Sequence, residues 1–331
     1  MELGSTGRAG AATGAVAKRR FRIEWPTIAL IVLCYGGWLA AGFVLWPQWP
    51  VLAFVVLALT VALQSSLTHE ALHGHPTRNA RLNELLVSAP IGLSWPYRRF
   101  KSLHLRHHAD ERLTDPFDDP ESYYQALWRH SVMPRPLRAL LRVNNTMIGR
   151  LILGPWLSII GLVLGDARAI AKGDRSIITA WVLHALGLAV VVPVVVLGFS
   201  MPIWLYVVCA AWPGLSLIAV RTYAEHQWSE DPEGRTIIVE KTPLGLLFLN
   251  NNLHFVHHAM PAMAWYKLPR IYRARRDEWV AANRGYVFPN YLAILRRYAF
   301  KAKEPVTHPV LRATPQCGGA SMWQQQRLAG K

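Results

Sequence analysis

The chain has 331 residues, is 52% hydrophobic and carries a formal net charge of +16. Such a charge is common in nucleic-acid-binding proteins, but here the basic residues are spread over three segments separated by apolar sequence, which argues against nucleic acid as a partner. The three cysteines form no CxxC pair, which argues against a disulfide framework and an iron–sulfur cluster.

The chain begins with a basic segment, residues 1–22, whose first part is rich in Gly and Ala. We expect this segment to be disordered. Its basic run Lys18-Arg19-Arg20 leads into an apolar stretch of full spanning length, which is too long for the hydrophobic part of a cleavable signal peptide. The first apolar helix should therefore stay in the protein as an anchor.

The first apolar stretch predicts a helical hairpin in a membrane. No Asp, Glu, Lys or Arg occurs between Trp25 and Thr68, and roughly 20 helical residues span the hydrocarbon core. The aromatic and proline residues of Trp46–Pro50 are typical of a turn at the headgroup level. We predict transmembrane helices over 27–46 and 51–68.

Two histidine clusters follow this hairpin. Residues three and four apart share one face of a helix, so each cluster can direct its imidazoles at one point. The clusters consist of His69 and His73, directly after the second helix, and of His104, His107 and His108.

Two shorter apolar runs predict helices at the membrane surface, over 85–95 and 151–165. The second run has fifteen residues between Arg150 and Asp166. Fifteen helical residues rise only about 22 Å, against a hydrocarbon core of about 30 Å. We therefore predict an in-plane or re-entrant helix.

A second hairpin is predicted between Ser176 and Val220, where charged residues are again absent. The break at Gly198–Pro202 gives transmembrane helices over 177–197 and 203–220. Further histidines come after this hairpin. They are His226, which follows Glu225, and the cluster of His254, His257 and His258.

All 36 Lys and Arg residues lie outside the two hairpins. The positive-inside rule places both termini and the central segment in the cytoplasm, with the protein in a bacterial-type inner membrane. The predicted fold is an all-α integral membrane protein, in which residues 23–302 form a single domain. Four transmembrane helices in two hairpins carry a cytoplasmic helical cap with a His-rich di-metal site, and residues 303–331 form a polar tail.

Nine clustered histidines indicate a catalytic metal centre. Imidazole binds iron, copper, zinc and nickel alike, so ligand type does not name the metal. A structural zinc site is closed by four ligands, and nine are too many for one ion. Two ions with up to six positions each would leave about three positions open. Open positions favour catalysis.

Three strings in the sequence resemble the histidine boxes of the membrane fatty acid desaturase and hydroxylase superfamily. They are His69–His75 (HEALHGH), Leu103–His108 (LHLRHH) with Asp115-Pro116 downstream, and Asn252–His258 (NLHFVHH). The segment after the third string, residues 257–269, is also similar, and the resemblance covers residues 65–270. The extended first string is similar to bacterial desaturases of small amino-acid-like substrates, such as the dihydrorhizobitoxine desaturase group.

This resemblance implies a non-haem di-iron enzyme that uses O₂ and two electrons to attack an unactivated C–H bond. The implied iron ligands are His69, His73, His104, His107, His108, His226, His254, His257 and His258. Residues expected to support them, or to contact the substrate, are Glu70, His75, Asp110, Glu225 and Asn252.

Several functions fit this pattern. The leading hypothesis is desaturation of a fatty acyl or membrane lipid substrate, with hydroxylation or desaturation of a small amino-acid-like metabolite as alternatives. A metal transporter or sensor is a different class, but transport ligands should lie at midplane depth, where only His184 is predicted. Because the chain has no haem-binding or Rossmann motif, we expect a separate ferredoxin or cytochrome, with its reductase, as electron donor. The acidic run Asp115–Glu121 is either a solvated loop or a docking surface for that donor. The sequence does not predict the oligomeric state.

Overall fold

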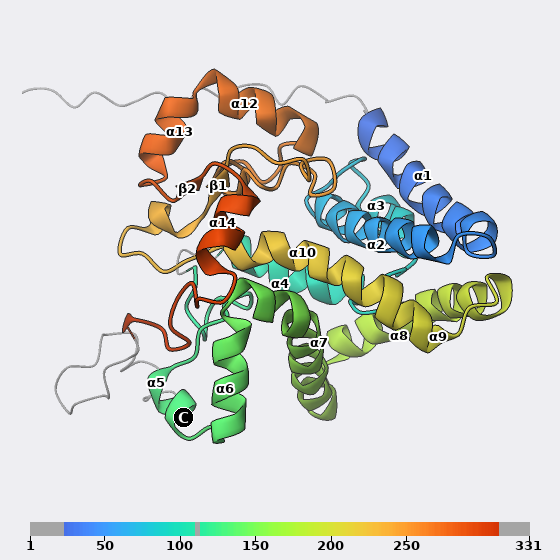
Figure 1. The fold of residues 1–331 in the computed structure, drawn as a ribbon, viewed down its shortest axis with the longest axis horizontal. Coiled ribbons are helices and arrows are strands. Elements are labelled where there is room, and N and C mark those ends of the chain that lie inside the picture. Colours follow the sequence, from blue (N-terminus) through green and yellow to red (C-terminus); the bar gives the residue numbers. More distant parts are fainter. Residues whose placement is uncertain (1–22, 110–112, 311–331) are drawn as a thin grey trace, which may run out of the picture.

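The computed structural model describes residues 23–109 and 113–310, which are mostly helical (Figure 1). Within these residues, five helical segments are long and apolar enough to cross a membrane: Trp25–Leu45, Pro50–Leu72, Met147–Ala171, Arg175–Gly198 and Ile203–Glu225. The disorder predicted for residues 1–22, and the part of the tail from 311 onward, lie outside the described residues.

The first hairpin consists of α1 (Trp25–Ala40), which continues as the π-helix η1 (Ala41–Leu45), and α2 (Pro50–Leu72). Pro50 stands in the first turn of α2, where its missing N–H costs nothing. The helix ends four residues later than predicted, so that His69 belongs to its last turns. It is also the most buried of the five apolar segments and packs against α1 and α10.

The second hairpin has more breaks in its helices. Its elements are α8 (Arg175–Pro193), the π-helix η2 (Val194–Gly198), α9 (Ile203–Tyr206), the π-helix η3 (Val207–Ala211) and α10 (Trp212–Glu225). The Asp174 side chain caps α8 by accepting hydrogen bonds from the N–H groups of Ser176 and Ile177. The turns of both hairpins lie at the same end of the molecule in Figure 1. There Phe199 packs so closely on Gly42 that a Cβ at Gly42 would lie 2.3 Å from its ring.

The helix predicted over 151–165 is in fact longer. α7 runs over Met147–Ala171. It begins after Thr146, whose side chain accepts a hydrogen bond from the N–H of Gly149, and it continues through both Arg150 and Asp166. Both charged side chains are accommodated inside the protein: Arg150 stacks on Tyr123, and Asp166 pairs with Arg99. The estimate of fifteen residues was therefore wrong, because a charged residue was taken as a helix boundary.

The surface helix predicted over 85–95 is also misplaced. Asn79 caps a shorter helix, α3 (Ala80–Leu86), by accepting from the N–H groups of Arg81 and Leu82. Between α3 and α4 (Tyr97–Ala109), the backbone forms turns and bends instead of a helix. Prolines at 90 and 96 disfavour the helical conformation of the residues before them, which explains the early end.

The remaining elements are short. Before α7 come α5 (Leu127–Ser131) and α6 (Arg135–Asn144). After α10 come η4 (Pro232–Arg235), β1 (Ile238–Val239), α11 (His254–Ala259), η5 (Trp265–Lys267), α12 (Leu268–Ala274), α13 (Arg276–Ala282), β2 (Val287–Phe288) and α14 (Tyr291–Tyr298). The two short strands pair in parallel, with Ile238 opposite Val287. A second core of Ile237, Phe248 and Ile294 packs beneath them.

Candidate metal centre

The nine histidines named from the sequence lie together in two adjacent groups. One group holds His69, His73, His104, His108 and His257, and the other holds His107, His226, His254 and His258. Within each group the ligand atoms lie within 4.8 Å of one another. The groups adjoin, since the rings of His108 and His258 stack with their centroids 4.1 Å apart.

Four helices contribute these side chains. The first box lies at the end of α2, the second on α4 and the third on α11, while His226 directly follows α10. On α4, the spacing sends His104 and His108 into one group and His107 into the other. On α11, His257 joins the first group, whereas His254 and His258 join the second. The second and third boxes therefore each contribute to both groups, whereas the first box contributes to one.

The ring nitrogens face one another at short distances. The Nε2 atoms of His73 and His104 are 3.1 Å apart, and those of His108 and His257 are 3.2 Å apart. In the other group, the Nε2 atom of His226 lies 3.0 Å from that of His107 and from that of His254. Lone pairs on neighbouring imidazoles repel unless a proton or a metal ion lies between them. The donor set therefore fits two metal ions.

Carboxylates orient the histidines of α4 through their other ring nitrogen. His104 Nδ1 donates to Glu121 Oε1 at 2.7 Å, and His107 Nδ1 donates to Asp119 Oδ1 at 2.8 Å. A hydrogen bond at Nδ1 fixes the tautomer and leaves Nε2 free for a metal. Asp119 is itself held by the N–H groups of Thr114 and Glu121.

An amide plays this part for the third box. His254 Nδ1 lies 2.9 Å from Asn251 Oδ1, and the Asn251 amide donates to Glu225 Oε1 at 3.3 Å. Glu225 also lies 3.4 Å from His254 Nδ1 and forms a buried ion pair with Arg221. Glu225 thus lies beside the third box, and its charge is balanced by Arg221 within the protein.

The other expected supporting residues lie elsewhere. Glu70 turns to the backbone N–H of Trp265 and to His75, whose Nδ1 donates to Glu24. Asn252 donates to the carbonyl of Val239, and its neighbour Asn251 is the residue that contacts a histidine of the third box. Asp110 lies outside the described residues.

Sequence reasoning missed Asp119 and Glu121. Both belong to the acidic run interpreted as a solvated loop or a docking surface, yet Asp119 is only 4% exposed and both carboxylates face histidines. The available signal was their distance from the second box, 12 residues from His107 to Asp119. A loop of this length can fold back on the helix that it leaves, but it need not do so.

The sequence model of the family described as fatty acid desaturase matches residues 46–290, more than half of the chain. The chain belongs to the fatty acid desaturase family. The matched range contains all three histidine boxes and His226. A search of curated proteins gave no match.

Burial sets the protonation of the clustered histidines. Burial and the neighbouring imidazoles lower the pKa of His108 to about 3 and place that of His258 well below its ordinary value. His107 is the exception, because Glu121 and Asp119 outweigh the effect of burial and raise its pKa to about 9. In turn, His104 and His107 overcome burial and hold the pKa of Glu121 well below its usual range. Most of the rings are therefore neutral at pH 7, as metal ligands must be.

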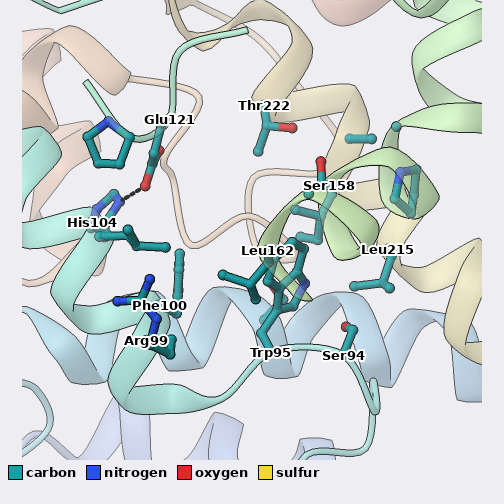
Figure 2. Close-up of a pocket in the computed structure, with 18 of the residues that line it drawn as sticks. Ser94, Trp95, Arg99, Phe100, His104, Glu121, Ser158, Leu162, Leu215 and Thr222 are labelled. Carbon is teal, nitrogen blue, oxygen red and sulfur yellow. Dashed lines mark hydrogen bonds and ion pairs between the residues drawn. The ribbon is translucent and has the colours of Figure 1, made fainter. Parts of the chain in front are cut away.

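A cavity of about 790 Å³ adjoins the centre (Figure 2). Members of both histidine groups line it, namely His69, His104 and His226. Its walls come from α2, α4, α7, α8 and α10, and they mix apolar side chains such as Leu162 and Leu215 with the hydroxyls of Ser94, Ser158 and Thr222. A small molecule in this cavity would lie against histidines of both groups.

Proposed function

We propose that the chain is an O₂-dependent desaturase that acts on an unactivated C–H bond of a fatty acyl or lipid substrate through a di-iron centre. The observation that carries this proposal is the meeting of two histidine groups at the wall of one cavity, in a member of the fatty acid desaturase family. Imidazole-rich sites with open positions suit iron, although they would also accept other divalent metals.

The protein's own part in the reaction is to hold and orient. The five histidines around His257 would hold one ion, and the four around His226 the other. Asp119 and Glu121 keep the Nδ1 protons of His107 and His104 on the side away from the ions. Bound iron would supply, with O₂ and two electrons, the oxidising power that removes hydrogen from the substrate. The cavity keeps the reacting carbon beside His69, His104 and His226.

The position of the two histidine groups also supports a topology in which the chain crosses the membrane four times. His107 precedes α7 and His226 follows α10, yet they lie together, so the chain between them crosses the membrane an even number of times. The hairpin of α8 to α10 accounts for two crossings, and we propose that α7 lies along the cytoplasmic membrane surface. In Figure 1, α7 runs across the direction of α2 and α10. Its exposed residues include Val163 and Leu164, as expected of a helix lying against lipid.

Hydroxylation remains the alternative outcome, since it begins with the same hydrogen abstraction. Desaturation of a small polar metabolite is a second candidate, favoured by the hydroxyl groups of Ser94, Ser158 and Thr222 in the cavity wall. We propose a separate ferredoxin or cytochrome as electron donor. A transport function is disfavoured, because the nine histidines cluster around helix ends.

The decisive experiment compares cells that express this chain with cells that express His257→Ala. Mass spectrometry of their lipids and small metabolites should show loss of two hydrogens from an acyl chain only with the intact protein. Gain of one oxygen would identify a hydroxylase. If the intact protein contains iron but forms no new lipid, a small metabolite is favoured as the substrate. Equal products from both cells would overturn the metal-centre proposal.

A further inference from the structure

One cation in the cavity wall has no carboxylate partner among the described residues. Arg150, near the start of α7, is only 4% exposed and lines the same cavity as the metal-facing histidines. Its Nε donates to the carbonyl of Asn144 at 3.1 Å, and its guanidinium carbon lies 3.6 Å from the centre of the Tyr123 ring. Its Nη1 atom makes no hydrogen bond.

Three other buried cations of this wall have carboxylate partners or several hydrogen bonds. Arg99 forms a bidentate pair with Asp166, and Arg221 pairs with Glu225. Lys303 donates to three oxygens, those of Tyr223, His226 and Tyr286. Among the described residues, no carboxylate lies within ion-pair distance of Arg150. A buried charge with an unmade hydrogen bond is costly, so a partner from outside the chain would be strongly favoured there.

A hydrogen-bond acceptor without a partner lies beside this donor. Asn144 is 5% exposed, its side-chain Oδ1 has no partner, and it also lines the cavity. A ligand at this point would meet one free guanidinium N–H and one free amide oxygen. Protein side chains leave both atoms unused, although either could form a bond to a small polar group.

This pair lies close to the histidine group around His226. The Arg150 guanidinium is 5.8 Å from the ring of Tyr223, which stands three residues before His226 on the chain. Lys303 bonds to the carbonyls of both Tyr223 and His226, so the two are fixed relative to each other. A group held by Arg150 would therefore be held a short distance from the metal centre.

We propose that Arg150 binds a carboxylate of the substrate. This inference rests on the proposed function and narrows its substrate class to a carboxylate-bearing amphiphile or metabolite that reacts at a carbon near its acid group. A carboxylate is favoured over a phosphate because only Arg150 has an N–H left for the ligand, while the second cation beside Tyr223, Lys303, already donates to three oxygens. The neighbouring Asn144 Oδ1 suits a donor on the same molecule, such as an amine or a hydroxyl.

The test is direct binding to the purified full-length protein in zwitterionic nanodiscs at neutral pH. Equilibrium dialysis would compare hexanoate with hexanamide, a neutral molecule of the same shape, and with hexyl phosphate. We expect hexanoate to bind at least about tenfold more tightly than either, since hydrogen bonds to charged groups are the strong ones. Equal binding of hexanamide, or tighter binding of hexyl phosphate, would overturn the proposal.

Variants identify the residue responsible. Arg150→Gln should weaken hexanoate binding at least about tenfold and leave hexanamide unchanged, while Arg150→Lys should restore part of the affinity. Arg98→Gln is the matched control, because Arg98 lines the same cavity but is half exposed and already paired with Glu84. Hexanoate binding that is unchanged in Arg150→Gln, or lost equally in Arg98→Gln, would contradict the role of Arg150.

Failure of this inference can be told apart from failure of the proposed function. Binding is measured without turnover, and iron content is measured on the same samples. If the protein contains iron and is active, but Arg150→Gln does not change hexanoate binding, only the carboxylate site is refuted. Hexanoate binding that depends on Arg150 in a protein unable to hold iron would support the site and refute the di-iron proposal.

Discussion

The Nε2 atoms of His107 and His226 lie 3.0 Å apart, although 119 residues separate them in the chain. Their contact joins the end of α4 to the end of α10, although α7 and the second hairpin lie between them in the sequence. Because both rings present the same nitrogen, either a proton or a metal ion must lie between them. This contact is therefore the most sensitive point at which to test the metal centre.

Replacing the carboxylate behind His107 should weaken metal binding. Asp119→Asn keeps the shape of the side chain but removes the charge that holds His107 Nδ1. We expect iron affinity or activity to fall about 10- to 100-fold, the usual effect of losing such a partner. Iron content and turnover would be compared with Asp277→Asn, whose carboxylate lies on the surface. Full iron occupancy and activity in Asp119→Asn would contradict the assigned role.

Metal uptake should depend on pH through the same histidine. The pKa of His107 is raised to about 9, so the metal-free protein holds a proton there at neutral pH, which a metal ion must displace. Uptake of Co²⁺, followed by its absorption, should therefore rise from pH 6 to pH 9. In Asp119→Asn the pKa of His107 falls, and the rise should come at lower pH. A profile that does not move would argue against proton competition at His107.

Filling the cavity should block the substrate without disturbing the metals. Gly161 lies on the cavity face of α7, and a Cβ there would meet no atom within 4 Å. Gly161→Val should therefore fold and hold iron normally, while turnover falls roughly 10- to 100-fold because the substrate is displaced. Gly36→Val, on α1, is the control, since it also has open space and lies outside the cavity wall. Normal turnover in Gly161→Val would place the substrate elsewhere.

The ion pair of Arg99 and Asp166 should matter for stability. It joins α4 to α7, and Trp181 Nε1 donates to the same carboxylate at 2.8 Å. The side chains are 16% and 4% exposed, so removing one partner leaves a buried charge. Asp166→Leu should cost about 3–5 kcal/mol of unfolding free energy.

The double variant with Arg99→Leu should recover much of that loss, since neither buried charge then remains. Thermal unfolding in detergent measures both variants. A double variant that is as unstable as Asp166→Leu would mean that packing of the carboxylate, rather than its charge, joins the helices.

The sequence by itself determined the long apolar helices and the nine clustered histidines. Both are recorded in local patterns: long stretches without charge give apolar helices, and histidines three and four residues apart must share a helix face. These patterns predicted four of the five long helical segments closely. They failed where a charge was taken as a boundary, at Arg150 and Asp166, because the partners that bury those charges are distant in sequence.

Only the tertiary structure decided how the histidines divide into two groups and which residues support them. His104 and His107 belong to one box but face different groups, and their partners Glu121 and Asp119 come from a loop whose path no local pattern determines. The same holds for Arg150, which has no carboxylate partner among the described residues. Whether a buried charge meets an opposite charge depends on every side chain packed around it. Spacing along a helix is set by backbone geometry, whereas contacts between helices are set by the packing of the whole chain.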